Sequence, residues 1–476
     1  MATAVLSRRE KVSKSFATNK SIILLTCLLV PLLAFISPVL SIIFVYGFGF
    51  YLLFKSDYKF LIFFVCFIFI QNITLMMFAE RFTSTTNTLF SLGKEIMVYV
   101  FCLKNILFAK NRRRIYPQIL ISILMLGFIV VSFFMSDAEM YAKIVSVRQL
   151  FLPFVCFYFG YYLNISETKK KRLFDLIVVL AIITAIVGLI EILILKDSFW
   201  VTLPIKRYQE NKGTEFDMYK GVPLNFYTWD FKDMTGNIIR RLVSIFGDPL
   251  TTAHFLFLGF VLTSFSNAKR KKLIKTILFV ASILTFSKGV YVCYLLYFLL
   301  KLLKKMTFKQ FKILFFVLVI LAVVFFSTFT TLISRLAPTS SIIIHINGFI
   351  NGVFNSSLLG SGVGKAGVIV SIKTGIDRLT GESYIGVISS QLGIIGLIIY
   401  VLFVVSVIFA LYRSYSKSKN QLTFLAMVLL LGVFAESFFS ESSVGLVATG
   451  LYFMLVGHEF RNSKKGQLSG RKKQNC

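Results

Sequence analysis

The sequence is poor in the residues that build metal, redox and disulfide sites. Its six cysteines are scattered along 476 residues, and none lies in a CxxC or other paired spacing, which argues against a disulfide framework and against a zinc site. The three histidines, His254, His345 and His458, are too far apart to form a local metal motif, and neither HExxH nor GxSxG occurs. We therefore expect no metal ion and no cofactor.

Acidic residues are also scarce, with 21 Asp and Glu against 52 Lys and Arg, and the net charge is +31. Such an excess is typical of nucleic-acid-binding proteins. Here, however, the cations crowd into short stretches between apolar runs, such as "KNILFAKNRRR" and "KRKKLIK". Cytoplasmic loops of membrane proteins are rich in Lys and Arg. The excess therefore indicates orientation in a lipid bilayer, with a secondary affinity for anionic lipid, and we expect no nucleic-acid partner.

Apolar runs take up much of the chain, which is 57% hydrophobic. Runs such as "SIILLTCLLVPLLAF" and "ILFFVLVILAVVFF" approach the roughly 20 residues that cross a bilayer as a helix. We predict an all-α polytopic integral membrane protein with about fourteen transmembrane helices, because a β-barrel would show short alternating segments. No small-residue cleavage site follows the basic N-terminus, which indicates a cytoplasmic tail and not a removed signal peptide.

The basic stretches place both termini in the cytoplasm and two long segments outside. The expected organisation is a basic cytoplasmic tail (1–20), an N-terminal transmembrane bundle (21–195), an external aromatic-rich loop (196–240), transmembrane helices with catalytic cations (241–330), an external loop with an amphipathic helix and a glycine-rich stretch (331–383), C-terminal transmembrane helices (384–458) and a second basic tail (459–476). Every cytoplasmic connection is short, and loops on a rigid scaffold usually carry function. We therefore expect the functional site on the external face.

Several residues of the external loops are candidates for binding. Trp229 belongs to an aromatic cluster that either stacks on sugar faces or forms an interfacial belt. His345 interrupts the apolar run "SIIIHINGFINGVF", which predicts an amphipathic helix on the outer surface. Gly360, Gly362 and Gly364 either let the backbone approach a substrate or make tight turns. The spacing GxxxxGK[ST] is absent from this stretch, so it does not predict a phosphate-binding loop.

Charged residues also stand at predicted helix ends. Arg240, Arg241 and Asp248 lie at the mouth of the apolar helix in "RLVSIFGDPLTTAHFLFLGF". Charges in hydrocarbon usually pair with each other or meet a ligand, so this group either binds an anion or stabilises the helix entrance as an Arg–Asp pair. Lys288 lies between two apolar spans too short to cross a full bilayer. We expect it in a cavity open to the outside, unless its side chain snorkels to the interface.

Four segments in order resemble a known family: "RLVSIFGDPLTTAHFL", "ILTFSKGVYVCYLL", "SRLAPTSS…GVFNSSLLGSGVGKAG" and "ESYIGVISSQLGIIGLIIY". They are similar to the characteristic blocks of the O-antigen ligase and polymerase superfamily, which includes the Wzy-type polysaccharide polymerases. The resemblance covers about residues 240–410. It implies a metal-independent glycosyltransferase with a GT-C-type fold in the bacterial plasma membrane. The implied substrate is a polyprenyl-diphosphate-linked glycan, and the implied partners are a chain-length regulator and a flippase of the same pathway.

The resemblance also assigns residues. Arg241 matches an arginine that opens the first block in the family, and Arg335 matches one ahead of the glycine-rich stretch. Lys288 stands in "SKG" where the family commonly has S-R-G, so the charge is kept but the bidentate fork is lost. Ligases commonly carry a histidine near the position of Glu382, and its absence here favours a polymerase.

The chemistry of the implied reaction agrees with these assignments. Cleaving the anomeric C–O bond leaves negative charge on the diphosphate and positive charge on the sugar. Fixed cations stabilise the former, and a carboxylate takes the proton of the acceptor hydroxyl. The predicted catalytic residues are Glu382 as the base and Arg241, Lys288 and Arg335 as cations; the predicted substrate-binding residues are Arg240, Arg378, Asp248, His345, Trp229, Gly360, Gly362 and Gly364. Glu436, Glu441 and Asp248 are the next carboxylates to consider as the base.

Two other functions remain open on these grounds. A ligase would move finished polymer to a different acceptor, and the residues separate it poorly from a polymerase. A flippase or transporter would move the same lipid-linked glycan, and such proteins often show two related halves with polar residues near the midplane. The sequence shows no convincing internal repeat, and the charges at predicted helix ends lie toward the external face, which favours an enzyme.

Overall fold

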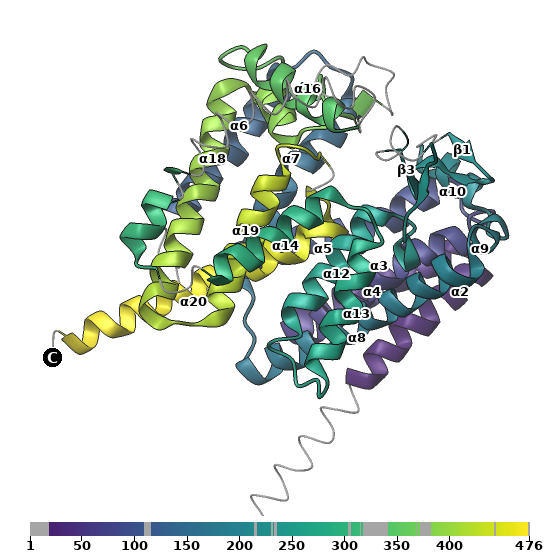
Figure 1. The fold of residues 1–476 in the computed structure, drawn as a ribbon, viewed down its shortest axis with the longest axis horizontal. Coiled ribbons are helices and arrows are strands. Elements are labelled where there is room, and N and C mark those ends of the chain that lie inside the picture. Colours follow the sequence, from purple (N-terminus) through teal and green to yellow (C-terminus); the bar gives the residue numbers. More distant parts are fainter. Residues whose placement is uncertain are drawn as a thin grey trace, which may run out of the picture.

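The computed structural model describes residues 19–108, 116–213, 217–229, 232, 236–302, 306–314, 316–317, 341–368, 370–371, 382–441 and 444–474. These residues are mostly helical (Figure 1). The only strands among them are two short antiparallel pairs, β1 (Met218–Tyr219) with β2 (Val222–Pro223) and β3 (Tyr227–Thr228) with β4 (Ile239–Arg240). Arg335 and Arg378 lie outside the described residues.

The N-terminal helices follow one another with short connections. They are α2 (Val30–Ile36), α3 (Pro38–Lys55), α4 (Asp57–Met77), α5 (Ser84–Leu107), α6 (Pro117–Met135), α7 (Met140–Tyr162) and α8 (Glu167–Ile190). Local sequence sets several of their starts. Prolines occupy the first turn of α3 and α6, where the missing N–H costs no helical bond. A reciprocal pair of hydrogen bonds between Thr83 and Thr86 caps α5.

The segment after α8 leaves the bundle and then returns to it. It contains α9 (Ser198–Val201), α10 (Ile205–Lys212) and the four strands. The C-terminal helices are α12 (Pro249–Leu262), α13 (Lys271–Ile283), α14 (Lys288–Leu302), α16 (Ser341–Phe354), α18 (Tyr384–Ser418), α19 (Gln421–Glu436) and α20 (Leu451–Gln474). Helix α16 coincides with the segment that the sequence predicts to be amphipathic.

Seven helices among the described residues are long and apolar enough to cross a membrane: Asn19–Ile36, Pro38–Lys55, Asp57–Met77, Pro117–Met135, Met140–Tyr162, Glu167–Leu195 and Tyr384–Ser418. The sequence predicted about fourteen. Helices α12, α13, α14 and α19 have only 14, 13, 15 and 16 residues, and α5 carries Lys94 and Glu95 near its middle. The chain is therefore a helical membrane-embedded protein in which several helices are too short to span alone.

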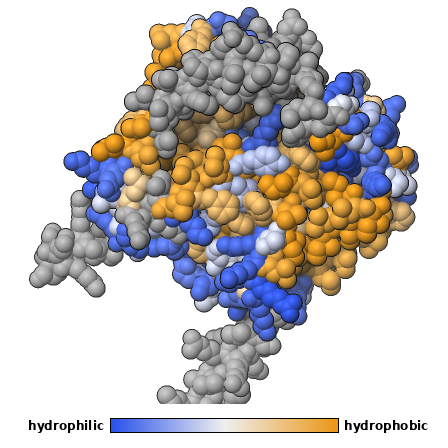
Figure 2. Space-filling model, in the orientation of Figure 1, coloured by the Kyte–Doolittle hydropathy of each residue, from blue (hydrophilic) through white to orange (hydrophobic). Residues whose placement is uncertain are grey.

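The outer surface of these helices agrees with a lipid environment. Large apolar side chains are exposed along α2, α3 and α6, among them Leu32, Ile43, Leu124 and Phe134. Figure 2 shows a broad apolar region over the lower right of one face, with hydrophilic side chains below it and at its upper right. A protein surrounded by water rarely exposes so large an apolar area.

Close backbone contact between α7 and α20 joins the N-terminal and C-terminal helices. A Cβ atom on Gly160 would overlap the carbonyl of Met454, and one on Gly457 would overlap that of Phe157. Small residues at such crossings let membrane helices approach closely. In Figure 1, α16 and strands β1 and β3 lie along the upper edge, opposite the basic connection between α12 and α13. The described parts of the two segments predicted to be external thus share one side of the molecule.

Candidate functional site

A cavity of about 370 Å³ lies between the β3 segment, the starts of α14 and α18, the end of α19 and α16. Its lining residues are Tyr227, Thr228, Trp229, Arg241, Leu250, Phe286, Lys288, Gly289, Val292, His345, Glu382, Glu436, Phe439 and Ser440. Five of the residues singled out in the sequence are brought together here: Arg241, Lys288, Trp229, His345 and Glu382. They come from segments up to about 150 residues apart, so the cavity is a product of the tertiary fold.

Backbone hydrogen bonds hold Arg241 at this cavity. Its N–H donates to the carbonyl of Phe226 at 2.8 Å, and the next N–H, of Leu242, donates to the carbonyl of Leu284 at 2.8 Å. The side chain is held as well, because Nε donates to the carbonyl of Thr285 at 2.9 Å. The segment that returns from the external loop is therefore fastened to the turn between α13 and α14, three residues before Lys288.

Lys288 is the first residue of α14, directly after the turn that ends α13. Helices α13 and α14 are both short, so the turn between them lies inside the helical bundle and does not project from its surface. Lys288 therefore lines the cavity. A cation at a helix N-terminus is unfavourable, because the helix macrodipole already places partial positive charge there. An anion bound in the cavity would be attracted by both Lys288 and the α14 dipole.

His345 and Glu382 lie beside each other at the cavity. His345 Nδ1 lies 3.4 Å from Glu382 Oε2, and the exposed fractions of the two side chains are 17% and 47%. Helix α16 reaches this position because it packs directly on the start of α18, where a Cβ atom on Gly352 would overlap the backbone of Gly386. Ser383 caps α18 by accepting a hydrogen bond from the Gly386 N–H at 3.0 Å, and this cap fixes the chain next to Glu382.

Aromatic side chains of the β3 segment form one wall of the cavity. Trp229 is 42% exposed, and Lys232 lies over its ring with Nζ 4.5 Å from the centroid. Tyr227 packs edge-on against Tyr219 with centroids 4.9 Å apart and donates its hydroxyl proton to Asp197. Burial, followed by this hydrogen bond, raises the pKa of Tyr227 well above its usual value. The phenol of Tyr227 therefore stays neutral. Of the two side chains, Trp229 has the more accessible ring.

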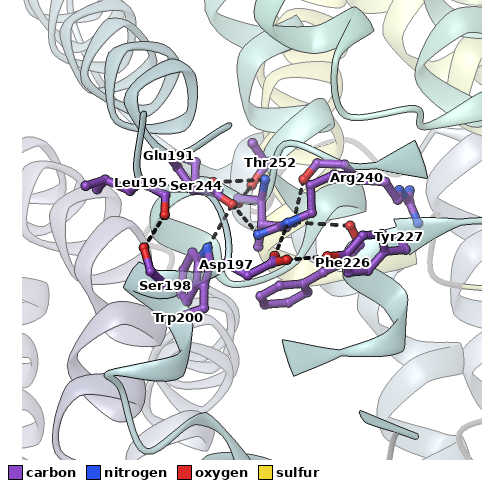
Figure 3. Close-up of polar contacts among 12 residues, drawn as sticks. Glu191, Leu195, Asp197, Ser198, Trp200, Phe226, Tyr227, Arg240, Ser244 and Thr252 are labelled. Atoms are coloured by element: carbon purple, nitrogen blue, oxygen red, sulfur yellow. Dashed lines mark hydrogen bonds and ion pairs between the residues drawn. The ribbon is translucent and has the colours of Figure 1, made fainter. Parts of the chain in front are cut away.

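Arg240, predicted to bind substrate, is used within the protein instead (Figure 3). Its Nε donates to Asp197 at 2.7 Å and its Nη2 to Glu191 at 2.8 Å. Nη1 donates to the carbonyls of Phe226 and Arg241 at 3.1 and 2.7 Å. Successive side chains of an extended segment point to opposite sides, so Arg240 is directed to the end of α8 while Arg241 lines the cavity. Arg240 is not among the lining residues.

Asp248 caps the N-terminus of α12. Its Oδ2 accepts a hydrogen bond from the Thr251 N–H at 2.8 Å at the start of α12, and Pro249 occupies the first helical position. The predicted alternative was an Arg–Asp pair at this helix entrance, but Arg240 pairs with Asp197 and Glu191 at the end of α8. Asp248 does not line the cavity.

The glycine-rich stretch forms a structural turn against α18, away from the residues that line the cavity. Gly360, Gly362 and Gly364 have φ values of +79°, +103° and +94°. The N–H groups of Ser361 and Gly362 donate to the carbonyls of Ser390 and Gln391 at 2.7 and 3.1 Å. These carbonyls are available because α18 is interrupted at Gly393 (φ +69°). The three glycines brace this interruption, which agrees with the tight-turn alternative, and their substrate-binding role stays a prediction.

The sequence reasoning missed the pair that forms the floor of the cavity. Glu436, at the end of α19, lines the cavity and lies with Oε1 3.0 Å from Nε2 of His254 on α12. The sequence offered Glu436 only as a reserve base and gave His254 no role. The available signal was a lone histidine inside an otherwise apolar helix, which in a membrane protein indicates a polar partner nearby.

No group of three or more His, Cys, Asp or Glu side chains that could hold a metal ion occurs in the described part of the chain. Comparison with protein-family models, curated proteins and solved structures finds no match to this chain.

Proposed function

We propose that the protein is a polysaccharide polymerase that joins polyprenyl-diphosphate-linked oligosaccharide repeat units, as in O-antigen, capsule or exopolysaccharide synthesis. It would act on the external face of the bacterial plasma membrane, with both termini in the cytoplasm, as a GT-C-type glycosyltransferase. One observation carries the proposal. A single cavity of a membrane-embedded helical protein contains two cations, a carboxylate–histidine pair and an accessible tryptophan.

The cations suit the diphosphate of the donor. Arg241 is held through Nε by the Thr285 carbonyl, so its guanidinium is fixed in place before substrate arrives. Lys288 adds a second charge at the α14 N-terminus. Preorganised positive charge stabilises the negative charge that develops on the leaving diphosphate, and this effect is strong where water is excluded. No metal ion is required for this step in the proposal.

Glu382 is placed to take the proton of the acceptor hydroxyl. Its carboxylate is half-exposed at the cavity and lies beside His345. As the bond from the donor sugar C1 to the diphosphate oxygen breaks, its electron pair leaves with the diphosphate. The acceptor hydroxyl oxygen forms the new bond to C1, and its proton passes to Glu382. Trp229 would stack on a sugar ring near this point, while the polyprenyl chain stays in the bilayer.

A ligase is the second candidate, and a specific contact favours it. The absence of a histidine near position 382 favoured a polymerase on sequence grounds. The fold nevertheless brings His345 to 3.4 Å from Glu382, so a histidine is present at that place in space. The sequence argument for a polymerase over a ligase is therefore weakened.

The lipid-linked glycans of a deletion strain test these functions. Accumulation of a single lipid-linked repeat unit would support a polymerase. Long lipid-linked chains that never reach another acceptor would identify a ligase instead. Substrate held on the inner leaflet would identify a flippase. Synthesis of long chains by the purified protein in proteoliposomes, given only lipid-linked repeat units, would exclude the need for a second enzyme.

A further inference from the structure

A buried carboxylate lies at the floor of the cavity. Glu436 lines the cavity but is only 1% exposed. Its Oε1 is hydrogen-bonded to His254, whereas Oε2 is buried without a hydrogen-bond partner among the described residues. Leaving a buried polar atom unsatisfied costs free energy, and the cost is greater for a charged group. Such an atom on the wall of a cavity points to a partner that the described residues do not supply.

The surroundings hold Glu436 firmly in this place. His254 is fixed in turn by Tyr452 on α20, whose hydroxyl donates to the His254 carbonyl at 2.7 Å. On the other side, Gly289 packs so closely that a Cβ atom there would overlap Glu436 Oε1. Gly289 follows Lys288 at the start of α14, so four helices meet at this carboxylate. The third residue of the "SKG" triplet therefore has a structural reason to be glycine.

We propose that Glu436, oriented by His254, stabilises the positive charge that develops on the donor sugar during transfer. This inference rests on the proposed glycosyl transfer and completes its charge balance. Arg241 and Lys288 face the negative diphosphate, but no group assigned so far opposes the cationic sugar. A carboxylate fixed in a buried, low-dielectric position interacts strongly with charge that forms beside it.

The two carboxylates of the cavity thus have different roles because their environments differ. Glu382 is half-exposed at the edge and can exchange protons with water, whereas Glu436 is enclosed and bonded to His254. Paired carboxylates divided in this way recur in enzymes that pass through cationic sugars. In the transfer step the proton goes to Glu382 and the electron pair leaves with the diphosphate. Glu436 takes no proton and forms no bond.

Azide distinguishes the two roles, because it is an anionic nucleophile with no proton to remove. The test measures cleavage of lipid-diphosphate-linked donor by the purified protein with the normal acceptor or with azide, which yields a glycosyl azide. For Glu436→Gln we expect kcat to fall roughly 10²- to 10³-fold with KM nearly unchanged, and azide should not restore cleavage. For Glu382→Gln azide should restore it, because only deprotonation of the acceptor is lost.

Glu459→Gln is the matched control. Glu459 is also 1% exposed and bonded within the membrane helices, to Lys170 and Thr423 at 3.2 Å each, but it is not among the residues that line the cavity. Its kcat should stay normal even if stability falls. Should Glu436→Gln fail to accumulate, His254→Leu removes the orienting donor and keeps the carboxylate. We expect that change to lower kcat at constant KM, and His254→Gln, which keeps a donor, to recover activity.

Three results would overturn the inference. Normal kcat in Glu436→Gln would show that the carboxylate is not needed, and azide rescue of that variant would make Glu436 the base. A rise in KM with normal kcat in Glu436→Gln would show that Glu436 affects only substrate binding, by acting on the nearby Lys288. The unmodified protein separates this inference from the proposed function: if it transfers no sugar, both are overturned, whereas a failure confined to the Glu436 comparisons leaves the proposed function intact.

Discussion

Arg241 donates from Nε to the carbonyl of Thr285 at 2.9 Å, in the turn that directly precedes Lys288. This bond joins the β4 segment to the break between two short helices. Together with the bond from the Leu242 N–H to the Leu284 carbonyl, it ties the elements that carry the two cations to each other. The proposed diphosphate site therefore depends on a side chain that is both a structural fastener and a positive charge.

Replacing Arg241 should remove transfer without removing the protein. We expect Arg241→Ala to abolish polymer formation, and Arg241→Lys to recover little, because lysine lacks the planar donor fork that reaches both Thr285 and a phosphate. Lys288→Arg should be tolerated, since it retains the charge. The measurement is chain formation by purified protein in proteoliposomes. Normal polymerisation by Arg241→Ala would exclude the diphosphate role.

Arg240 offers a direct contrast with its neighbour. Its guanidinium pairs with Glu191, which is 1% exposed, and with Asp197. Removing one partner of a buried pair leaves a charge uncompensated and typically costs about 3–5 kcal/mol. We expect Arg240→Ala to lower the thermal unfolding midpoint in detergent clearly, and more than Arg241→Ala does. Loss of substrate affinity at unchanged stability would restore the binding role that the sequence predicted for Arg240.

Glu382 is the predicted base. Glu382→Gln keeps size and hydrogen bonding but cannot accept a proton, so turnover should fall roughly 10²- to 10⁴-fold while lipid-linked substrate still binds. Binding and turnover are measured separately on the same preparation. Near-normal turnover would eliminate Glu382 and direct attention to His345, 3.4 Å away.

The glycine-rich stretch should respond to mutation as a structural element. An alanine at Gly360 would need φ near +79°, and its Cβ would overlap the backbone at Gly393. We expect Gly360→Ala to reduce the yield of folded protein in the membrane. Alanine at Gly47, where the added Cβ meets nothing within 4 Å, is the control. Full yield of Gly360→Ala with a raised KM would instead indicate a substrate cradle.

Sidedness is open to chemical labelling. With the native cysteines replaced, a cysteine at the exposed position Lys206 of α10 should react with an impermeant maleimide in intact cells. One at the exposed position Lys272 of α13 should react only after permeabilisation. The reason is the concentration of Lys and Arg around Lys272 on the predicted cytoplasmic side. The opposite pattern would invert the topology and place the cavity in the cytoplasm.

The class of the protein and much of its local structure could be predicted from the amino-acid sequence. Long apolar runs require burial in lipid or protein, so membrane-embedded helices followed from composition and run length. The helix at Ser341–Phe354 and the break before Lys288 could be predicted because their signals lie within a few residues. The number of membrane-spanning helices could not be predicted in this way, because hydropathy does not separate a short helix packed within the bundle from one that crosses the bilayer.

Which side chains come into contact could not be predicted from the sequence, because it depends on how the helices pack. The sequence placed Arg240 and Arg241 in the same site, but their opposite directions depend on the pairing of β4 with β3 and on Glu191 at the end of α8. Likewise His254 and Glu436 are 182 positions apart in the sequence, and the residues around either one do not predict that the two are in contact. Hydrophobic burial is non-directional and can be read along the chain, whereas a hydrogen bond depends on distance and angle. The distances in this site are set only when the helices pack.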